Sequence, residues 1–372
     1  MSKTLIFGGA FDPPHCEHVQ MCKAAMKELG ADRLVIVPTY LPPHKEAGFL
    51  DFDVRCELIN RAFCDTEYII DKIEEERKGD NYSAIVLPIL KQKYGDIIYL
   101  IGGDSLAHIE TWYKPKNIIA CCPIAVCARE GYDNAHTQID NLKNKYCGEF
   151  YLLSYKGRDV SSSLIRAKLL LGERCDEISD YVYEYIAKEH LFDDYKPYLD
   201  KLRTFMTDEL FEHSKAVVKR AIDFNAKHHL RQDFKKVFLA ALLHDNAKQR
   251  PSIDGLNVPS DSIGTPVLHQ FLGAEKAKRD FGVTDTDILD AIRYHTSAKA
   301  NMSMLEKLIY TADSLSDDRT YEPIPKLRAI AVEDFEAGFR AVLGYTYKKV
   351  CEKGKGMYPL TEAAKKYYLD NV

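Results

Sequence analysis

Two histidines near the start of the chain have the type and spacing to bind a phosphate group. His15 and His18 follow the glycines Gly8 and Gly9 in the stretch GGAFDPPHCEH. Residues three apart share one face of a helix, so both imidazoles can point at one anion. Glycines let the backbone approach a phosphate, and the free N–H groups at a helix start favour negative charge. The order of residues therefore predicts a phosphate-binding turn, although loop glycines and surface histidines would account for the composition alone.

A second group of histidines and aspartates lies in the other half of the chain. Imidazole nitrogens and carboxylate oxygens suit zinc, manganese or iron, and no cysteine belongs to the group. A single histidine on a helix is most often structural, but this group occupies separate helical segments, and two of its histidines adjoin apolar runs. The predicted metal ligands are His213, His244, Asp245, His269, His295 and Asp313.

Short apolar runs predict the strands that position the first group. Runs that are apolar on both faces fit a parallel sheet, and ligands of such sheets bind beyond the carboxyl ends of the strands. We therefore expect an α/β, Rossmann-like N-terminal domain in which Gly8, Pro38 and Gly102 converge on one crevice. The expected strands cover 4–7, 34–38, 68–70, 97–101, 124–127 and 151–153.

A charged, proline-bearing segment at 192–197 predicts a boundary between two domains. Beyond it the pattern is helical almost throughout, with no clear strand. We therefore expect domains at 1–193 and 194–372, the second of them all-α. Two helices expected near 332–352 and 361–370 are interpreted as packing or interface elements, with no chemistry assigned to them.

The composition limits the classes of function. The 372 residues are 46% hydrophobic and carry a net charge of −5, so no basic field attracts nucleic acid or an anionic membrane. The glycines lack the G-x-G-x-x-G spacing of a dinucleotide-dependent oxidoreductase. The ten cysteines are scattered without a C-x-x-C pair, and there is no signal peptide or long apolar run. These features predict a cytoplasmic enzyme with reduced thiols, and a homo-oligomer is compatible with them.

The pattern GG-x-FDPPH-x-x-H closely resembles the ATP-binding signature of the nucleotidyltransferase superfamily, and within it that of bacterial nicotinate-nucleotide adenylyltransferases. The resemblance implies that Gly8, Gly9 and Phe11 belong to the ATP-binding motif. One position departs from the family. Glu17 stands where the family usually has glycine, and a side chain there would crowd or repel the nucleotide.

Further motifs that resemble this family follow in order through the first half. The PPHK loop implies phosphate contacts from His44 and Lys45. The N-Y-S segment stands where the family has S-Y-T, which implies a substrate hydroxyl contact from Ser83, although a helix N-cap explains it nearly as well. The GGDSL segment and the tryptophan after it imply that Trp112 stacks on a nicotinate ring and that Asp104 contacts ribose or orders the loop. A lone tryptophan is otherwise usually a core residue.

A serine-rich helix start provides a second candidate anion site in the first half. Ser162 and Ser163 offer hydroxyl groups, and Arg166 follows one turn later, so together they form an anion clamp. An ordinary capped helix is the alternative. The segment resembles the I-S-S-T-x-I-R motif of the family, which implies binding of the ATP phosphates.

The resemblance implies transfer of AMP from ATP to nicotinate mononucleotide. The substrate phosphate attacks the α-phosphorus in line, so positioning and charge neutralisation would suffice, without a protein nucleophile. The implied catalytic residues are His15, His18, Lys45 and Arg166, with Mg²⁺ held largely by ATP. Nicotinamide mononucleotide or phosphopantetheine remain alternative acceptors, because no obvious cationic side chain is placed against a nicotinate carboxylate.

The order H…HD…H…H…D in the second half resembles the HD superfamily of metal-dependent phosphohydrolases. More narrowly, LLHDNAK, GAE-K, AIRYHT and TADSLSDDR resemble the bacterial HD-type bis(5′-nucleosyl)-tetraphosphatases, which cleave diadenosine tetraphosphate symmetrically to ADP. That family implies a dinuclear iron centre. By this resemblance Asp245 bridges two metals, of which one is bound by His213, His244 and Asp313 and the other by His269 and His295.

Two basic residues complete the predicted hydrolase site. Lys248 lies one turn after Asp245 and could reach a substrate phosphate, and Arg319 matches an arginine that follows the last aspartate in the family. Asn246 and Ser316 depart from the family pattern, but neither is a predicted ligand. A different nucleotide substrate, or a regulatory nucleotide-binding module, is the alternative for this half.

Overall fold

The computed structural model describes residues 2–41, 50–128, 134–249, 252–253, 255–354 and 356–370. The chain forms two compact units, one of 1–166 and 174–191 and the other of 167–173 and 192–372. The segment 167–173 groups with the second unit, which the sequence did not indicate. Its Glu173 carboxylate lies 3.1 Å from Lys215 and 2.9 Å from Lys219 on a helix of that unit.

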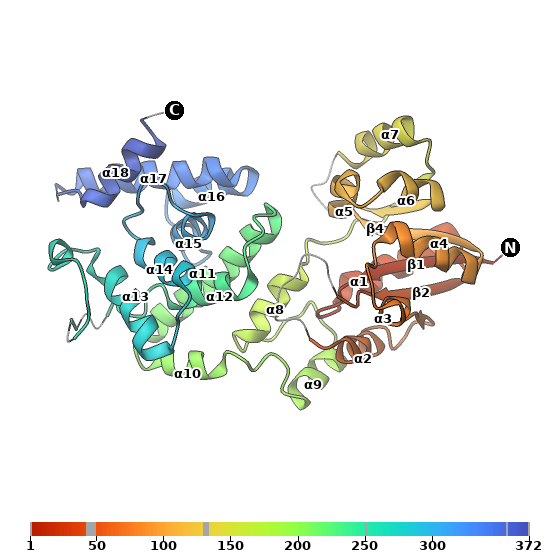
Figure 1. The fold of residues 1–372 in the computed structure, drawn as a ribbon, viewed down its shortest axis with the longest axis horizontal. Coiled ribbons are helices and arrows are strands. Elements are labelled where there is room, and N and C mark those ends of the chain that lie inside the picture. Colours follow the sequence, from red (N-terminus) through yellow and green to blue (C-terminus); the bar gives the residue numbers. More distant parts are fainter. Residues whose placement is uncertain are drawn as a thin grey trace. The chain divides into compact units, whose positions relative to one another are not determined.

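The first unit is built on a parallel sheet of six strands in the order β3-β2-β1-β4-β5-β6. Figure 1 labels β1, β2 and β4 of this sheet. The α/β class and the parallel sheet predicted from the sequence are confirmed. β1 lies between β2 and β4, so the carboxyl ends of these three strands are neighbours. The strands are β1 (Lys3–Gly9), β2 (Arg33–Pro38), β3 (Ile69–Ile70), β4 (Asp96–Gly102), β5 (Ile124–Cys127) and β6 (Phe150–Leu152).

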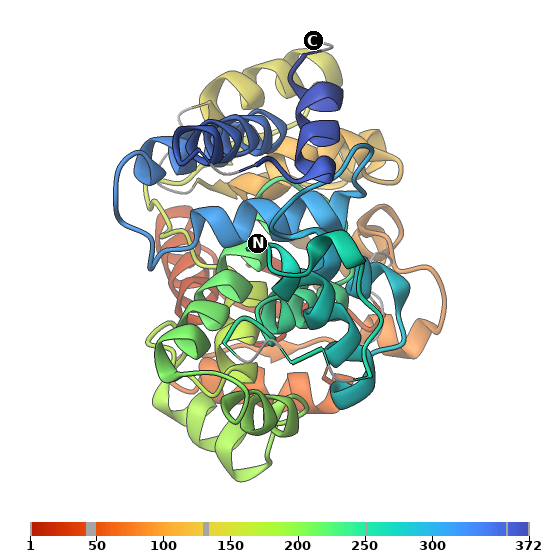
Figure 2. The same cartoon turned by 90° about the vertical axis from the view of Figure 1, so that its left-hand side faces the viewer.

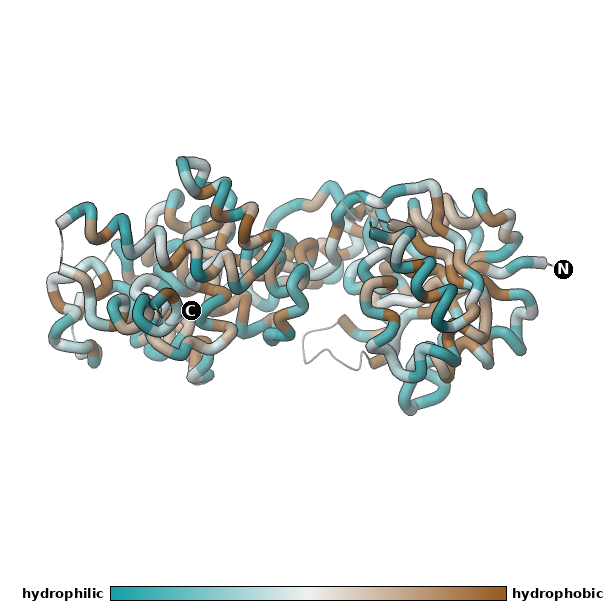
Figure 3. The backbone as a smooth tube through the Cα atoms, turned by 90° about the horizontal axis from the view of Figure 1, so that it is seen from above, coloured by the Kyte–Doolittle hydropathy of each residue, from teal (hydrophilic) through white to brown (hydrophobic). Residues whose placement is uncertain are grey.

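Both faces of this sheet are buried, which explains why its strands are continuously apolar. Ile6 packs in one core cluster, whereas its neighbours Leu5 and Phe7 pack in the other. Hydrophobic segments accordingly run through the interior of this unit in Figure 3. The helices of this unit are α1 (Cys16–Leu29), α2 (Phe52–Ala62), α3 (Ile73–Arg77), α4 (Ser83–Tyr94), α5 (Gly103–His108), α6 (Pro115–Cys121), α7 (Ala135–Tyr146) and α9 (Asp180–Lys188). Helix α8 (Ser162–Leu170) begins in this unit and ends in the segment that groups with the second unit.

The second unit is helical, and its described residues contain no strand (Figure 2). Its central helix is α12, in which every residue from Val237 to Leu243 is buried. The helices are α10 (Lys196–Arg203), α11 (Asp208–Lys227), α12 (Phe234–Leu243), α13 (Leu268–Phe281), α14 (Thr286–Tyr294), α15 (Met304–Leu315), α16 (Ile324–Glu333), α17 (Phe335–Glu352) and α18 (Pro359–Tyr368).

The helix expected near 332–352 is α17, and a further helix that the sequence analysis did not expect, α16, precedes it, with a break between the two. The break comes at Asp334, whose carboxylate accepts a hydrogen bond of 2.9 Å from the backbone N–H of Ala337. This is the geometry of a helix N-cap. Gly338 lets the two helices approach closely, because a Cβ atom there would lie 2.3 Å from that of Ala331. Among the described residues, no helix has both the length and the apolarity needed to cross a membrane.

A buried arginine joins the loops at the carboxyl edge of the sheet. Arg55 on α2 is 1% exposed and donates to the carbonyl oxygens of Ala10 at 2.7 Å, Thr39 at 2.8 Å and Tyr40 at 3.1 Å. From the sequence, an arginine on this amphipathic helix is predicted to be a structural ion-pair partner and not a site residue. The structural role is seen, but the hydrogen bonds of Arg55 within the described residues go to backbone carbonyls.

We predict that Arg55→Ala lowers the free energy of unfolding of the first unit by about 3 kcal/mol, because it removes a buried charge-assisted donor from several carbonyls. Trp112 is the only tryptophan in the sequence, so its fluorescence during urea unfolding reports this unit alone. The control is Arg61→Ala on the same helix, where a half-exposed pair with Glu57 should contribute less than about 1 kcal/mol. Equal effects of the two substitutions would contradict this role.

Candidate active sites

A cavity of about 190 Å³ opens at the carboxyl edge of the sheet in the first unit. This is where open α/β sheets bind their ligands. Six residues that the sequence analysis proposed line it together: Gly8, His15, His18, Gly102, Asp104 and Trp112. Trp112 also packs against the core, so the core role considered for it is seen, and its place in the cavity lining is compatible with the predicted stacking.

The two histidines form one unit at the start of α1. The imidazole Nδ1 of His18 accepts a hydrogen bond of 3.1 Å from the backbone N–H of His15. The two rings are stacked, with centroids 3.6 Å apart. His15 is buried and His18 half-buried. Both rings therefore meet the cavity in a fixed relation to each other.

The predicted anion clamp at α8 is joined to the turn after β1. Arg166 forms a buried ion pair with Asp12. The Ser162 hydroxyl donates to the carbonyl oxygen of Pro13 at 3.1 Å. Arg166, Ser162 and Ser163 do not line the cavity of 190 Å³. The guanidinium of Arg166 is thus held beside the phosphate-binding turn, with its charge balanced by Asp12.

Five other predicted residues are not among the described residues that line this cavity. The Phe11 ring is 1% exposed and packs against Phe7 and His18, so a substrate contact from Phe11 would have to come from its backbone. The Ser83 hydroxyl lies 3.3 Å from that of Tyr99, a cavity residue that the sequence analysis missed because it lies within an apolar strand. Gly9 is not among the lining residues, and a Cβ there would lie 3.2 Å from the Phe11 ring. His44 and Lys45 lie outside the described residues.

Glu17 lines the cavity where the family usually has glycine. Its buried carboxylate accepts hydrogen bonds from the Tyr155 hydroxyl at 2.8 Å and from Arg158 Nε at 2.8 Å. Burial would raise the pKa of Glu17, but these two donors lower it below its ordinary value. Arg158, which the sequence analysis did not single out, therefore brings a compensating charge to the same wall.

In the second unit, helices α11, α12, α13, α14 and α15 bring all six predicted metal ligands together. Nitrogen and oxygen atoms of His213, His244 and Asp313 lie within 4.8 Å of one another, and those of His244, Asp245 and His295 do likewise. His269 Nε2 lies 3.4 Å from Asp245 Oδ1, as does His295 Nε2. His244 thus belongs to both groups, and Asp245 of the second group lies beside His269 and His295.

Three of the four imidazoles are oriented in the same way. Nδ1 of His244, His269 and His295 lies 2.7 to 2.8 Å from the backbone carbonyl three residues earlier. Carbonyl oxygens only accept, so each Nδ1 carries the proton and each Nε2 presents a lone pair to the cluster. Backbone acceptors that fix the tautomer are typical of metal-binding histidines.

For His213, the carboxylate of Asp318 takes the place of the backbone carbonyl that orients each of the other three rings. Its Nδ1 donates to Asp318 Oδ2 at 2.8 Å, while its Nε2 lies 2.9 Å from Asp313 Oδ1. Burial disfavours charge on this ring, but the two carboxylates raise the pKa of His213. Asp318 was missed by the sequence analysis, because nothing in the run SDDR distinguishes it from Asp317.

The cluster fits a pair of divalent metal ions. His244 Nε2 and Asp245 Oδ1 are buried and make no hydrogen bond among the described residues. Such atoms are costly to bury unless a cation or donor satisfies them. Burial opposes charge on His244, but Asp245 and Asp313 raise its pKa to about 9. Burial together with His295 lowers the pKa of His269 to about 4. The carboxylates of the cluster thus favour a positive charge at its centre, and a metal ion bound there would replace the proton on His244.

The metal-ligand helices approach closely at one glycine. A Cβ atom on Gly273 of α13 would lie 3.2 Å from the carbonyl oxygen of His244. The Asn246 side chain donates to the carbonyl of Gly273 at 3.0 Å. Asn246, one of the two departures from the family pattern, therefore links the end of α12 to α13.

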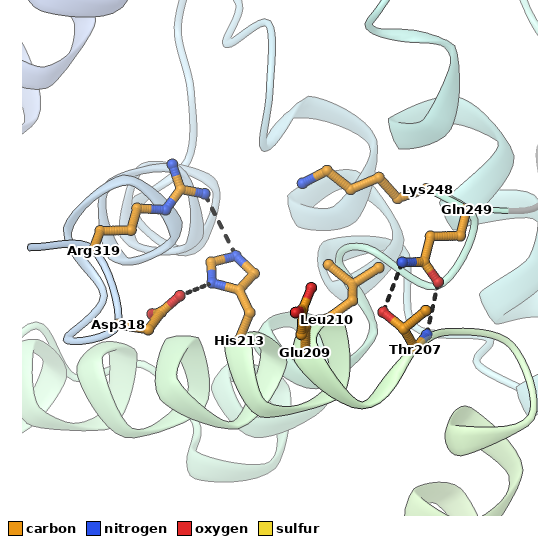
Figure 4. A pocket seen from close by; sticks show the side chains of 8 residues that line it. All are labelled: Thr207, Glu209, Leu210, His213, Lys248, Gln249, Asp318 and Arg319. Atoms are coloured by element: carbon orange, nitrogen blue, oxygen red, sulfur yellow. Dashed lines mark hydrogen bonds and ion pairs between the residues drawn. The ribbon is translucent and has the colours of Figure 1, made fainter. Parts of the chain in front are cut away.

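Two basic side chains border the cluster. Lys248 Nζ lies 2.6 Å from Asp245 Oδ2, and Arg319 donates to Asp313 Oδ1 at 2.6 Å. Both line a cavity of about 450 Å³ that also reaches His213, shown in Figure 4. In that view Arg319 and Asp318 contact His213 from two sides. The cationic side chains of Lys248 and Arg319 thus lie next to the predicted metal ligands, where they could contact a phosphate group.

Two family models match the chain, one in each half. The cytidylyltransferase-like family model matches residues 6–168, and the HD domain model matches residues 210–318.

Relatives match each half and nearly the whole chain. A probable nicotinate-nucleotide adenylyltransferase/Ap4A hydrolase of Mycoplasma genitalium is 27% identical over 94% of this chain and 99% of its own length. A probable nicotinate-nucleotide adenylyltransferase of Clostridium acetobutylicum is 31% identical over 52% of this chain and all of its own length. A crystal structure of a predicted HD superfamily hydrolase involved in NAD metabolism, also from Clostridium acetobutylicum, has a TM-score of 0.45 and 29% identity over 48% of this chain and 98% of its own.

The first half thus carries the family's fold and covers the full length of a relative that exceeds 30% identity, and an HD domain follows it. The chain belongs to the nicotinate-nucleotide adenylyltransferase family, as a member that also carries an HD domain.

Proposed function

We propose that the chain is a bifunctional enzyme, with a functional boundary near residue 193. The first domain transfers AMP from ATP to nicotinate mononucleotide and releases pyrophosphate. The second hydrolyses diadenosine tetraphosphate symmetrically to two molecules of ADP. The convergence of His15 and His18 with Gly8 and Gly102 on one cavity supports the first activity, and the six-ligand cluster supports the second.

The transfer needs positioning and charge neutralisation. A phosphate oxygen of the mononucleotide attacks the α-phosphorus of ATP, and the bond to the bridging oxygen breaks as pyrophosphate leaves. His15 and His18 would donate to the phosphate oxygens that gain charge, and Arg166 would assist from the start of α8. Lys45 is proposed to hold the leaving phosphates, which arrive with Mg²⁺ as part of the substrate. Trp112 would stack on the acceptor ring.

The choice of acceptor is tested by competition. Purified protein is given ATP with equal amounts of nicotinate mononucleotide, nicotinamide mononucleotide and phosphopantetheine, and the dinucleotide products are separated by chromatography. We expect nicotinate adenine dinucleotide to dominate. A dominant product from either other acceptor would reassign the first domain.

The hydrolase proposal places each residue of the second site. His213, His244, Asp245 and Asp313 would hold one divalent metal, and Asp245, His269 and His295 the other. Two such metals, proposed to be iron, would supply an activated water molecule and positive charge beside the phosphate under attack. Lys248 and Arg319 would hold phosphate oxygens, so that water attacks the β-phosphorus and ADP leaves. The relatives of Mycoplasma genitalium and Mycoplasma pneumoniae, both named as Ap4A hydrolases, support this assignment.

Product analysis tests the hydrolase. Anaerobically purified protein is incubated with diadenosine tetraphosphate, and the nucleotides are separated by ion exchange. ADP alone is the expected result. ATP with AMP would contradict symmetric cleavage, and no turnover in a metal-loaded sample would favour another substrate or a regulatory role.

We predict that His18→Ala lowers kcat for adenylyl transfer by about 10²–10³, because one preorganised donor to the transition state is lost. Pyrophosphate release measures the rate. The control is His136→Ala, at an exposed position on α7. A loss of less than threefold in the His18 variant would remove this residue from the reaction.

His244→Ala should abolish hydrolysis of diadenosine tetraphosphate while adenylyl transfer continues, because the ring lies between both ligand groups. The control is His229→Asn at the exposed end of α11, where Asn tolerates the positive φ. Both activities are measured on one preparation. Hydrolysis that survives in the His244 variant would exclude a metal-dependent reaction at this cluster.

Asp318→Asn is expected to weaken metal binding by about 10–100-fold, because Asp318 orients His213. Competition with a chelator measures the affinity. Asp317→Asn is the matched control, since its exposed side chain pairs with Arg220 instead. Equal affinities for the two variants would show that Asp318 has no orienting role.

A further inference from the structure

The second unit contains a larger cavity on the other side of the metal cluster, with a volume of about 720 Å³. His269, His295 and Asp313 form one end of it, and α16 and α17 supply its opposite wall. The HD domain model ends at residue 318, before these two helices begin. The sequence analysis had interpreted the helix expected at 332–352 as a packing or interface element, with no chemistry assigned to it.

The lining of this cavity is basic. Lys248, Arg319, Lys349 and Lys353 line it, whereas the only carboxylate among the described lining residues is that of the metal-ligand candidate Asp313. Among the described residues, neither Lys349 nor Lys353 pairs with a carboxylate. Such a surplus of positive charge beside a metal centre suits a polyphosphate.

Aromatic rings surround one of these lysines. Lys349 Nζ lies 5.0 Å from the centre of the Tyr321 ring and 5.3 Å from that of Tyr345. Ile324, Leu327 and Val342 make the adjoining wall apolar. The Tyr310 hydroxyl on the same lining is buried and makes no hydrogen bond among the described residues. Rings, aliphatic groups and an available hydroxyl are what a nucleobase and ribose require.

The residues that α17 contributes to the cavity lie on one face of that helix. Val342, Tyr345, Lys349 and Lys353 recur every three or four positions and all line the cavity. Lys348, which lies between them in sequence, is exposed and instead lies 3.9 Å from Glu352. The chain therefore offers a neighbouring lysine that does not face the cavity.

We propose that this cavity is a nucleotide subsite that binds one half of a dinucleoside polyphosphate. The base packs against Tyr321 and Tyr345, and Lys349 and Arg319 hold the phosphates that lead to the metal cluster. The cavity of 450 Å³ shares Lys248 and Arg319 with it and reaches the cluster beside His213, which leaves room for the second half of the substrate. The assignment of the two halves rests on the proposed hydrolase function.

Photolabelling of the full, metal-loaded chain with 8-azido-ADP tests the subsite by position. Peptide mapping by mass spectrometry separates label on 320–353 from label in the first unit, which serves as an internal reference. We expect label on 320–353, a loss of about tenfold in Lys349→Ala, and recovery in Lys349→Arg. Lys348→Ala should leave the labelling unchanged, and metal content should be equal in all variants.

The outcomes separate the subsite from the hydrolase activity. In the same variants, Lys349→Ala should raise KM for diadenosine tetraphosphate about tenfold, with kcat within about twofold. Normal turnover with no label on 320–353, or with label that does not depend on Lys349, would overturn the subsite and leave the hydrolase standing. Lys349-dependent label without turnover would support the subsite and reject diadenosine tetraphosphate as the substrate.

Discussion

Hydrogen bonds from three imidazole Nδ1 atoms to backbone carbonyls determine what the second unit can do. They turn Nε2 of His244, His269 and His295 toward Asp245, and the carboxylate of Asp318 orients His213 in the same sense. Because each acceptor is backbone or a second carboxylate, the rings are fixed before any ligand arrives. The burial of α12 makes this possible, since its apolar residues hold His244 and Asp245 at the centre of the bundle. Buried carboxylates and imidazoles without full hydrogen bonding destabilise a fold unless they are compensated, and the proposed metal pair would provide that compensation.

The first unit achieves preorganisation through its loops. Arg55 holds the turn after β1 and the segment after β2 by their carbonyl groups, and Asp12 holds Arg166 beside the same turn. Adenylyl transfer requires few covalent events, so fixed donors around the phosphates account for its needs. Glu17 and Arg158 form an ion pair that lines one side of the cavity of this unit. A glycine at position 17 would leave that space open.

The sequence predicted the fold where local patterns were strong. Six short apolar runs became six parallel strands, because a sheet buried on both faces requires such runs. The six metal-ligand candidates could be selected by residue type, and their helices bring them together. The residues that orient or surround these groups could not be selected in this way. Asp318 and Asp317 are equivalent in sequence, and only packing directs one of them to His213. Tyr345 and Lys349 resemble any polar helix surface until α17 is placed against the cluster.

Anomalous diffraction from crystals grown with manganese or iron would test the central claim most directly. We predict two peaks, one among His213, His244 and Asp313 and one beside His269 and His295, with Asp245 contacting both. A crystal with metal in excess that shows no peak among these six residues, or one peak that does not contact Asp245, would contradict the dinuclear centre.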